Sequence, residues 1–77
     1  MNELRRIIFE DINNERERQE NIHPEKLDLP MRFTTLVEEV GEVATAIQNN
    51  DNENLYEELV QVAAVCVRMI EDVSGKE

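Results

Sequence analysis

Residues that break helices, form cross-links or bind zinc are scarce in this chain. Its 77 residues include two glycines, two prolines, one cysteine and one histidine. A single cysteine excludes an intrachain disulfide, and a single histidine argues against a zinc site. Because no cross-link is available, packing has to stabilise the fold, and we expect Cys66 to be a reduced thiol in a reducing compartment.

Long apolar segments are also missing. The longest unbroken apolar run covers residues 62–67, whereas a helix needs about 20 apolar residues to cross a bilayer. The first residues, MNELRRIIFED, lack the apolar centre of a secretory signal peptide. We therefore expect a cytoplasmic protein without membrane attachment.

Positive charge is sparse. Eight basic residues face 18 acidic ones, which gives a formal net charge of −10. Such a chain lacks the cations that neutralise phosphates when a protein binds nucleic acid, so we expect no nucleic-acid partner. The charge is compatible with binding of divalent cations. It is equally compatible with plain solubility, and charge alone does not separate the two interpretations.

Apolar residues recur at helical spacing along nearly the whole chain. The pattern predicts an all-α fold, a small bundle of three main helices over about residues 2–21, 31–49 and 53–73 in a single domain, 1–77. Asp28 is the expected N-cap of the second helix, and Gly75 suits the end of the third. Because the connection over residues 49–53 is short, we expect the second and third helices to be antiparallel neighbours.

The first two helices each contain an irregular feature. The apolar stripe of the first helix ends at Ile12, and the following segment ERERQE, residues 15–20, is polar on the same face. Either this half projects into water or it covers a polar cavity. In the second helix Gly41 occupies an interior position, where glycine is unfavourable, and this predicts that something approaches its backbone closely.

The third helix is apolar around most of its circumference. Its polar residues are confined to a narrow strip: Glu57, Gln61, Arg68 and Asp72. A helix of this kind should be buried on nearly every side, and two other short helices can hardly bury it. We therefore expect the bundle to be completed by oligomerisation, as a homodimer or a homotetramer.

Glutamates cluster on the second and third helices. The spacings of Glu39 to Glu42 and of Glu38 to Glu42 bring these side chains within reach of one another. Glu58 falls inside the apolar arc of the third helix, where an unpaired carboxylate is strongly disfavoured. With Gln61, the cluster supplies four to five oxygens that suit Mg²⁺ or Mn²⁺. The alternative is a solvated acidic surface.

The sequences EEVGE at 38–42 and EELVQ at 57–61 resemble the MazG-like nucleotide pyrophosphohydrolases of the all-α NTP pyrophosphatase group. That family has E-E-x-x-E on one helix and E-x-x-D on the next. The first element matches in full. Gln61 stands where the second has aspartate. The resemblance covers about residues 31–73, and ERERQE is similar to the first helix of phage-type members.

The resemblance implies an enzyme that cleaves a nucleoside triphosphate to the monophosphate and pyrophosphate, with Mg²⁺ as cofactor and Mn²⁺ as the alternative. It implies that Glu39, Glu42 and Glu58 hold the metal together with Gln61, and that Glu38 is the catalytic base. Residues of the first helix, the loop and the second helix would contact the nucleotide: Arg18, Gln19, Lys26 and Arg32.

Two other functions stay open at this point. The chain can be a catalytically weak MazG-like module that binds nucleotide or metal for regulation, which the glutamine at position 61 would favour. It can also be an acidic interaction module that docks on a basic protein, which the net charge of −10 would favour.

Overall fold

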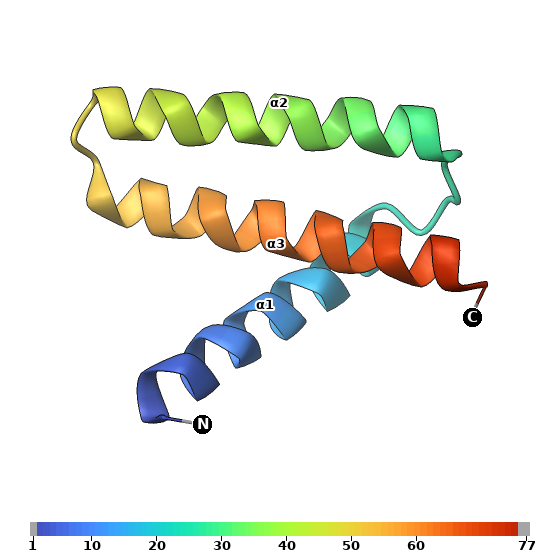
Figure 1. The fold of residues 1–77 in the computed structure, drawn as a ribbon, viewed down its shortest axis with the longest axis horizontal. Coiled ribbons are helices and arrows are strands. Elements are labelled where there is room, and N and C mark those ends of the chain that lie inside the picture. The colour runs from blue at the N-terminus through green and yellow to red at the C-terminus, as the bar shows by residue number, and fades with distance from the viewer. Residues whose placement is uncertain (1, 76–77) are drawn as a thin grey trace.

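Three helices contain nearly all of the residues that the computed structural model describes, which are residues 2–75 (Figure 1). They are α1 (Glu3–Ile22), α2 (Leu29–Gln48) and α3 (Asn52–Ser74), and no strand occurs over the described range. The predicted all-α class is confirmed. Each helix begins and ends within two residues of the limits expected from the sequence.

Local capping chemistry sets the helix limits. The Asp28 side chain accepts a hydrogen bond from the Met31 backbone N–H at 3.1 Å, and Pro30 lies in the first turn of α2, where its missing N–H costs nothing. The Asp51 carboxylate caps α3 in the same way. Gly75 ends α3 with a left-handed backbone, φ 68°, which glycine adopts without strain.

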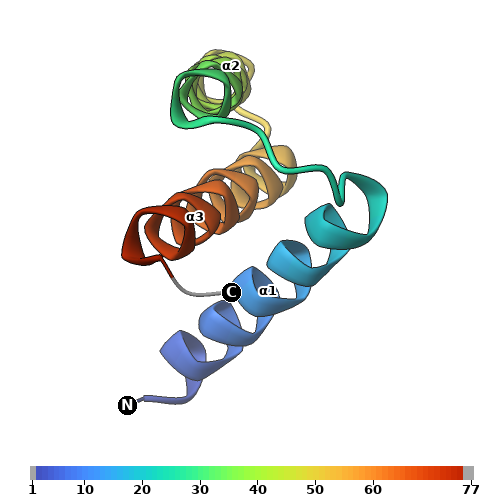
Figure 2. The same ribbon diagram turned by 90° about the vertical axis from the view of Figure 1, so that its right-hand side faces the viewer.

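The middle position in the fold belongs to α3. Helix α2 runs antiparallel along it, and α1 crosses it obliquely from the opposite side (Figures 1 and 2). The reversal between α2 and α3 is tight because Asn50 takes a left-handed conformation, φ 54°, which asparagine tolerates better than most residues. This tight turn fixes the relative position of the two glutamate-bearing helices.

The core formed by one chain is small. Among residues 2–75, the buried apolar side chains are those of Ala46, Ala64 and Val65. Large apolar side chains stay exposed on both long helices: Phe33, Val37, Val40 and Ile47 on α2, and Leu59, Val67, Ile70 and Val73 on α3. The apolar stripe of α2 therefore does not face α3, and packing within the chain leaves it uncovered.

Gly41 does not meet a close neighbour. A Cβ atom built at this position has no described atom within 4 Å, apart from those of its own helix and chain neighbours. The expectation of a close backbone approach is therefore wrong for the single chain. Gly41 belongs to the exposed part of α2, so the periodicity showed where it lies along the helix but not what lies opposite.

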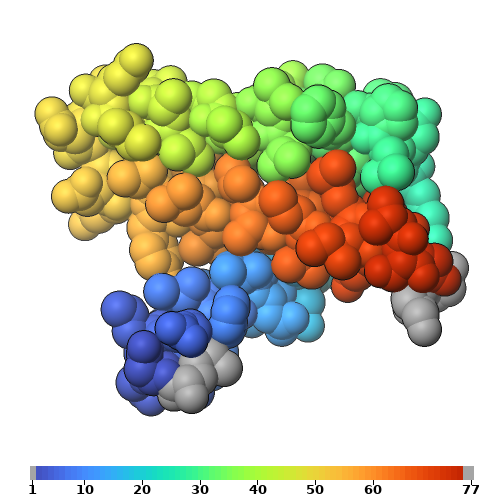
Figure 3. All heavy atoms as spheres, viewed as in Figure 1, coloured from blue at the N-terminus to red at the C-terminus, as the bar shows by residue number. Residues whose placement is uncertain are grey.

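The two halves of α1 have different surroundings. Its N-terminal half extends away from the other helices (Figure 3). In its polar C-terminal half, Glu15, Arg16 and Gln19 are partly buried, and Gln19 Nε2 contacts the backbone oxygen of Gln61 on α3 at 3.5 Å. Of the two interpretations of the ERERQE segment, the structure supports the one in which this half covers polar cavities.

Arg68 is buried although it belongs to the polar strip of α3. Only 5% of its surface is exposed. Its Nη2 donates hydrogen bonds to the backbone oxygens of His23 at 2.8 Å and Glu25 at 3.5 Å. The α1–α2 loop passes over this part of α3, and helical periodicity carries no information about the path of a loop.

None of the helices over the described residues combines the length and the apolar character needed to cross a membrane.

Candidate metal centre and the adjoining pocket

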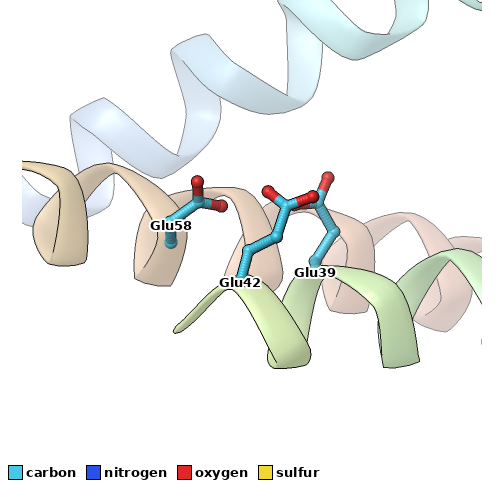
Figure 4. Close-up of side chains that lie close together, drawn as sticks. All are labelled: Glu39, Glu42 and Glu58. Carbon is cyan, nitrogen blue, oxygen red and sulfur yellow. The ribbon is translucent and has the colours of Figure 1, made fainter. Parts of the chain in front are cut away.

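Three glutamates converge between α2 and α3. Glu39 and Glu42 extend from α2 and Glu58 from α3 (Figure 4). One carboxylate oxygen from each residue lies within 4.8 Å of the other two. The spacing of three residues places Glu39 and Glu42 on one face of α2, and the antiparallel packing brings Glu58 opposite them. This geometry brings together the three glutamates among the four residues predicted to be metal ligands.

The electrostatics of the cluster disfavour three free carboxylates. Only 9% of Glu58 is exposed, and this burial raises its pKa to about 7, with further contributions from a hydrogen bond to Glu42 and from the charges of Glu42 and Glu39. Burial also raises the pKa of Glu39, and the charge of Glu42 adds to it. Like charges in partly dry surroundings hold protons unless a cation replaces them.

Gln61 lies between two of these carboxylates. With its amide nitrogen turned toward them, it donates hydrogen bonds to Oε1 of Glu39 and Oε1 of Glu58, each at 3.0 Å. The residue thus satisfies two acceptors that would otherwise repel each other. In the opposite orientation the amide oxygen faces the same carboxylates, and only that orientation offers a ligand atom to a cation, because the amide nitrogen cannot act as one.

Glu38 is separated from this cluster. It is exposed and is not among the three glutamates whose oxygens converge. Successive residues of a helix point about 100° apart, so when Glu39 faces α3, Glu38 faces outward. Its role as general base therefore stays a prediction that rests on the family resemblance.

A cavity of about 290 Å³ adjoins the cluster and is enclosed by α1, the α1–α2 loop, α2 and α3. Glu39 forms part of its wall, together with Arg18, Gln19 and Arg32. Three of the four residues predicted to bind substrate therefore share one pocket with a candidate metal ligand. Lys26 does not line this pocket. It lines a neighbouring cavity of about 290 Å³.

Sequence reasoning missed several polar residues of this pocket, among them Glu15 and Arg68. Glu15 accepts hydrogen bonds from the Arg18 guanidinium at 2.8 Å to both of its oxygens, and this pairing lowers the pKa of Glu15. The loss of apolar residues on the inner face of the first helix was the signal for Glu15. No local signal existed for Arg68, because the loop buries it.

Comparison with known proteins agrees with this geometry. The family model of the MazG nucleotide pyrophosphohydrolase domain matches residues 31–73, more than half of the chain. The chain therefore belongs to the MazG family. The match includes the glutamate cluster and Gln61 but excludes α1. No curated protein and no solved structure gives a significant match.

Proposed function

We propose that this protein is an Mg²⁺-dependent nucleoside triphosphate pyrophosphohydrolase that cleaves a ribo- or deoxyribonucleoside triphosphate to the monophosphate and pyrophosphate, and that it cleans the nucleotide pool. The single observation that carries the proposal is the convergence of Glu39, Glu42 and Glu58 beside a pocket. The family to which the chain belongs supplies the reaction class.

The residues of the cluster fit a divalent cation. Carboxylate oxygens are the ligands that Mg²⁺ and Mn²⁺ prefer, and the raised pKa of Glu58 is the response of a carboxyl group that lacks a positive partner. Glu39, Glu42 and Glu58 would hold the ion. When bound, it would supply positive charge to the phosphates and make a bound water more acidic.

The other residues of the chain would bind and orient the substrate. The wall of the pocket contains Arg18 and Gln19 from α1 and Arg32 from α2, which can donate hydrogen bonds to phosphate or base. On the family resemblance we assign the removal of the proton from the attacking water to Glu38, which lies outside the glutamate cluster on the exposed side of α2. Helix α1 restricts the access of bulk water to the pocket from one side.

We further propose that the protein is a homodimer or homotetramer in the cytoplasm. The exposed apolar residues of α2 follow spacings of four and three: Phe33, Val37, Val40, Ala44 and Ile47. This is the spacing by which helices of different chains pack in bundles. Gly41 is open on the same helix, and the core of one chain is too small for independent stability.

The test is a panel of nucleoside triphosphates incubated with Mg²⁺ and scored for pyrophosphate. We expect release from at least one nucleotide, and loss of release in Glu39→Gln and Glu42→Gln together with weaker Mg²⁺ binding. Glu38→Gln should stop release while Mg²⁺ binding is retained. Glu57→Gln, an exposed neighbour on α3, is the control. The proposal is refuted if no nucleotide releases pyrophosphate with either Mg²⁺ or Mn²⁺.

One observation favours a second candidate function, a module that binds nucleotide without turnover. Gln61 offers no charge at the position where the family has aspartate, and with its amide nitrogen turned toward the cluster it bridges Glu39 and Glu58. For such a module, Mg²⁺ and nucleotide together should raise the melting temperature while pyrophosphate stays absent.

A further inference from the structure

Two buried arginines lie in the wall of the pocket that contains Glu39. Only 6% of Arg32 and 5% of Arg68 is exposed, which makes them the buried basic residues over residues 2–75. Both line the pocket beside Glu39, and both also line the neighbouring cavity. The two guanidinium groups therefore form a partition between the two cavities, in a protein with a formal net charge of −10.

The buried arginines are the less well paired ones. Arg16 makes hydrogen bonds of 2.8 Å to Glu20 and Glu71, and Arg18 makes two of 2.8 Å to Glu15. The side chains in these pairs are exposed or only partly buried. More deeply buried cations need closer partners than these, because burial removes the water that would otherwise solvate them.

Arg32 lacks a hydrogen-bond partner at one of its nitrogens. Its Nε is buried and makes no hydrogen bond to any described residue. The nearest carboxylate oxygen in an ion pair with it, Oδ2 of Asp72, is 3.8 Å away, which is beyond hydrogen-bond distance. Burial lowers the pKa of Arg32, and the positive charge of Arg68 lowers it further. A second cation beside an unsatisfied donor is an arrangement that an anion would stabilise.

Arg68 also has no close carboxylate among the described residues. Its nearest ion-pair partner is Oε1 of Glu20 at 3.8 Å, and its hydrogen bonds go to backbone oxygens of the α1–α2 loop. Backbone carbonyls orient a guanidinium without neutralising it. Backbone hydrogen bonds therefore orient the Arg68 guanidinium, but no carboxylate of residues 2–75 lies within hydrogen-bond distance of it to balance its charge.

The position of the pair relative to the glutamates is set by α2. Arg32, Thr35 and Glu39 follow spacings of three and four residues and all line the pocket, so they share one face of the helix. Seven residues correspond to about 10 Å along a helix axis. The pocket thus has Glu39, the one member of the glutamate cluster that lines it, toward one end and a guanidinium pair suited to an anion toward the other.

We propose that Arg32 and Arg68 form a phosphate-binding subsite that holds the terminal phosphates of the substrate, the part that leaves as pyrophosphate. Guanidinium groups bind phosphate through paired, charge-assisted hydrogen bonds. The identity of the substrate as a triphosphate rests on the proposed function, but the binding of pyrophosphate to the subsite does not require turnover. The ligand class is a polyphosphate anion, and a nucleoside monophosphate alone should bind less well.

The experiment measures binding of inorganic pyrophosphate to the full chain in EDTA, by calorimetry and by melting temperature, at matched ionic strength. Pyrophosphate should bind and raise the melting temperature of the wild type. Arg32→Met should weaken its binding about tenfold or more, the effect of losing hydrogen bonds to a charged group. Arg32→Lys should weaken it less, because an ammonium keeps the charge but loses the planar fork.

A second readout separates this role from a structural one. Since Arg32 is buried with an unsatisfied donor, Arg32→Met without any anion should melt at the same temperature as the wild type or higher. A purely structural arginine would lower it. Arg5→Met, which removes one exposed arginine near the start of α1, is the matched control and should leave pyrophosphate affinity within about twofold.

Three results would overturn the subsite: no binding of pyrophosphate to the wild type in EDTA, unchanged affinity in both Arg32 variants, or tighter binding of AMP than of pyrophosphate. The Glu39→Gln variant distinguishes this failure from failure of the proposed function. It should lose Mg²⁺-dependent pyrophosphate release yet still bind pyrophosphate in EDTA, because its substitution lies at the other end of the pocket.

Discussion

Raising the pH from about 5 to about 8 without divalent metal should destabilise the folded protein through Glu58. Its pKa in the folded chain is about 7, against an ordinary value of 4.5. Below the ordinary value the carboxyl is protonated in both states, so its favourable contribution to stability is fully present. As the pH rises through 7, the folded state has to ionise a buried group and this contribution is lost.

The size of the effect follows from these two values. The interval from 4.5 to about 7 corresponds to at most about 3.5 kcal/mol in the free energy of unfolding, at about 1.4 kcal/mol for each pH unit. This is a large part of the total for a small domain, and each kcal/mol shifts the melting temperature by about 4–8 °C. Glu39, whose pKa burial also raises, acts in the same direction.

One neighbouring carboxylate acts in the opposite direction, but at lower pH. The hydrogen bond from Arg18 lowers the pKa of Glu15, so the stabilisation from that pair is present above the ordinary carboxylate range and is lost only as the pH falls below it. The decline between about pH 5 and pH 8 is therefore assigned to the clustered glutamates, Glu58 and Glu39.

The assay is urea unfolding followed by circular dichroism in EDTA, at a series of pH values and one protein concentration, since an oligomer's stability depends on concentration. Glu58→Gln should remove most of the decline, whereas Glu57→Gln, its exposed neighbour, should keep it. Added Mg²⁺ should stabilise the wild type more at about pH 8 than at about pH 5, because protons compete with the ion for the carboxylates.

A wild type that is equally stable at both ends of this pH range would refute the prediction, and so would a Glu58→Gln variant whose stability declines as steeply. In either case burial and the neighbours Glu39 and Glu42 would not raise the pKa of Glu58.

Two further predictions concern the amide in the cluster and the open apolar face. Gln61→Asp should raise the affinity for Mn²⁺ about tenfold or more by calorimetry. It should also lower the melting temperature in EDTA, because it adds a negative charge beside Glu39 and Glu58 in place of the amide. If both values are unchanged, residue 61 does not belong to the site. Val40→Glu and Ile70→Glu, on the exposed apolar stripes, should convert the protein to monomers, as measured by light scattering after size exclusion. Thr45→Glu, at a polar exposed position, is the control and should not. A wild type that is already monomeric would contradict the proposed assembly.

Local chemistry accounts for what the sequence predicted well. Asp28 and Gly75 mark helix ends through contacts with residues at most three positions away, so a reader of the sequence can place both. The periodicity of α2 puts Glu39 and Glu42 on one face. The short turn that follows α2 constrains α3 to run antiparallel to it. The meeting of these two with Glu58 follows from those constraints, while their role as metal ligands stays a prediction.

The open apolar face was predicted only in part from the sequence. The sequence indicated that α3 is too apolar for one chain to bury, and the structure shows large apolar side chains exposed on α2 as well. Composition and periodicity reveal that a surface needs cover. They do not reveal which helix faces are used within the chain and which remain open.

Caps, turns and helical periodicity act over a few residues, so three helices, their limits and an acidic pair on one of them could be predicted from the sequence. The position of Gln61 beside two carboxylates and the burial of Arg32 and Arg68 emerge only from the packing of the three helices. These features depend on how each helix is rotated about its own axis and on where the α1–α2 loop passes, and contacts between distant parts of the chain set both.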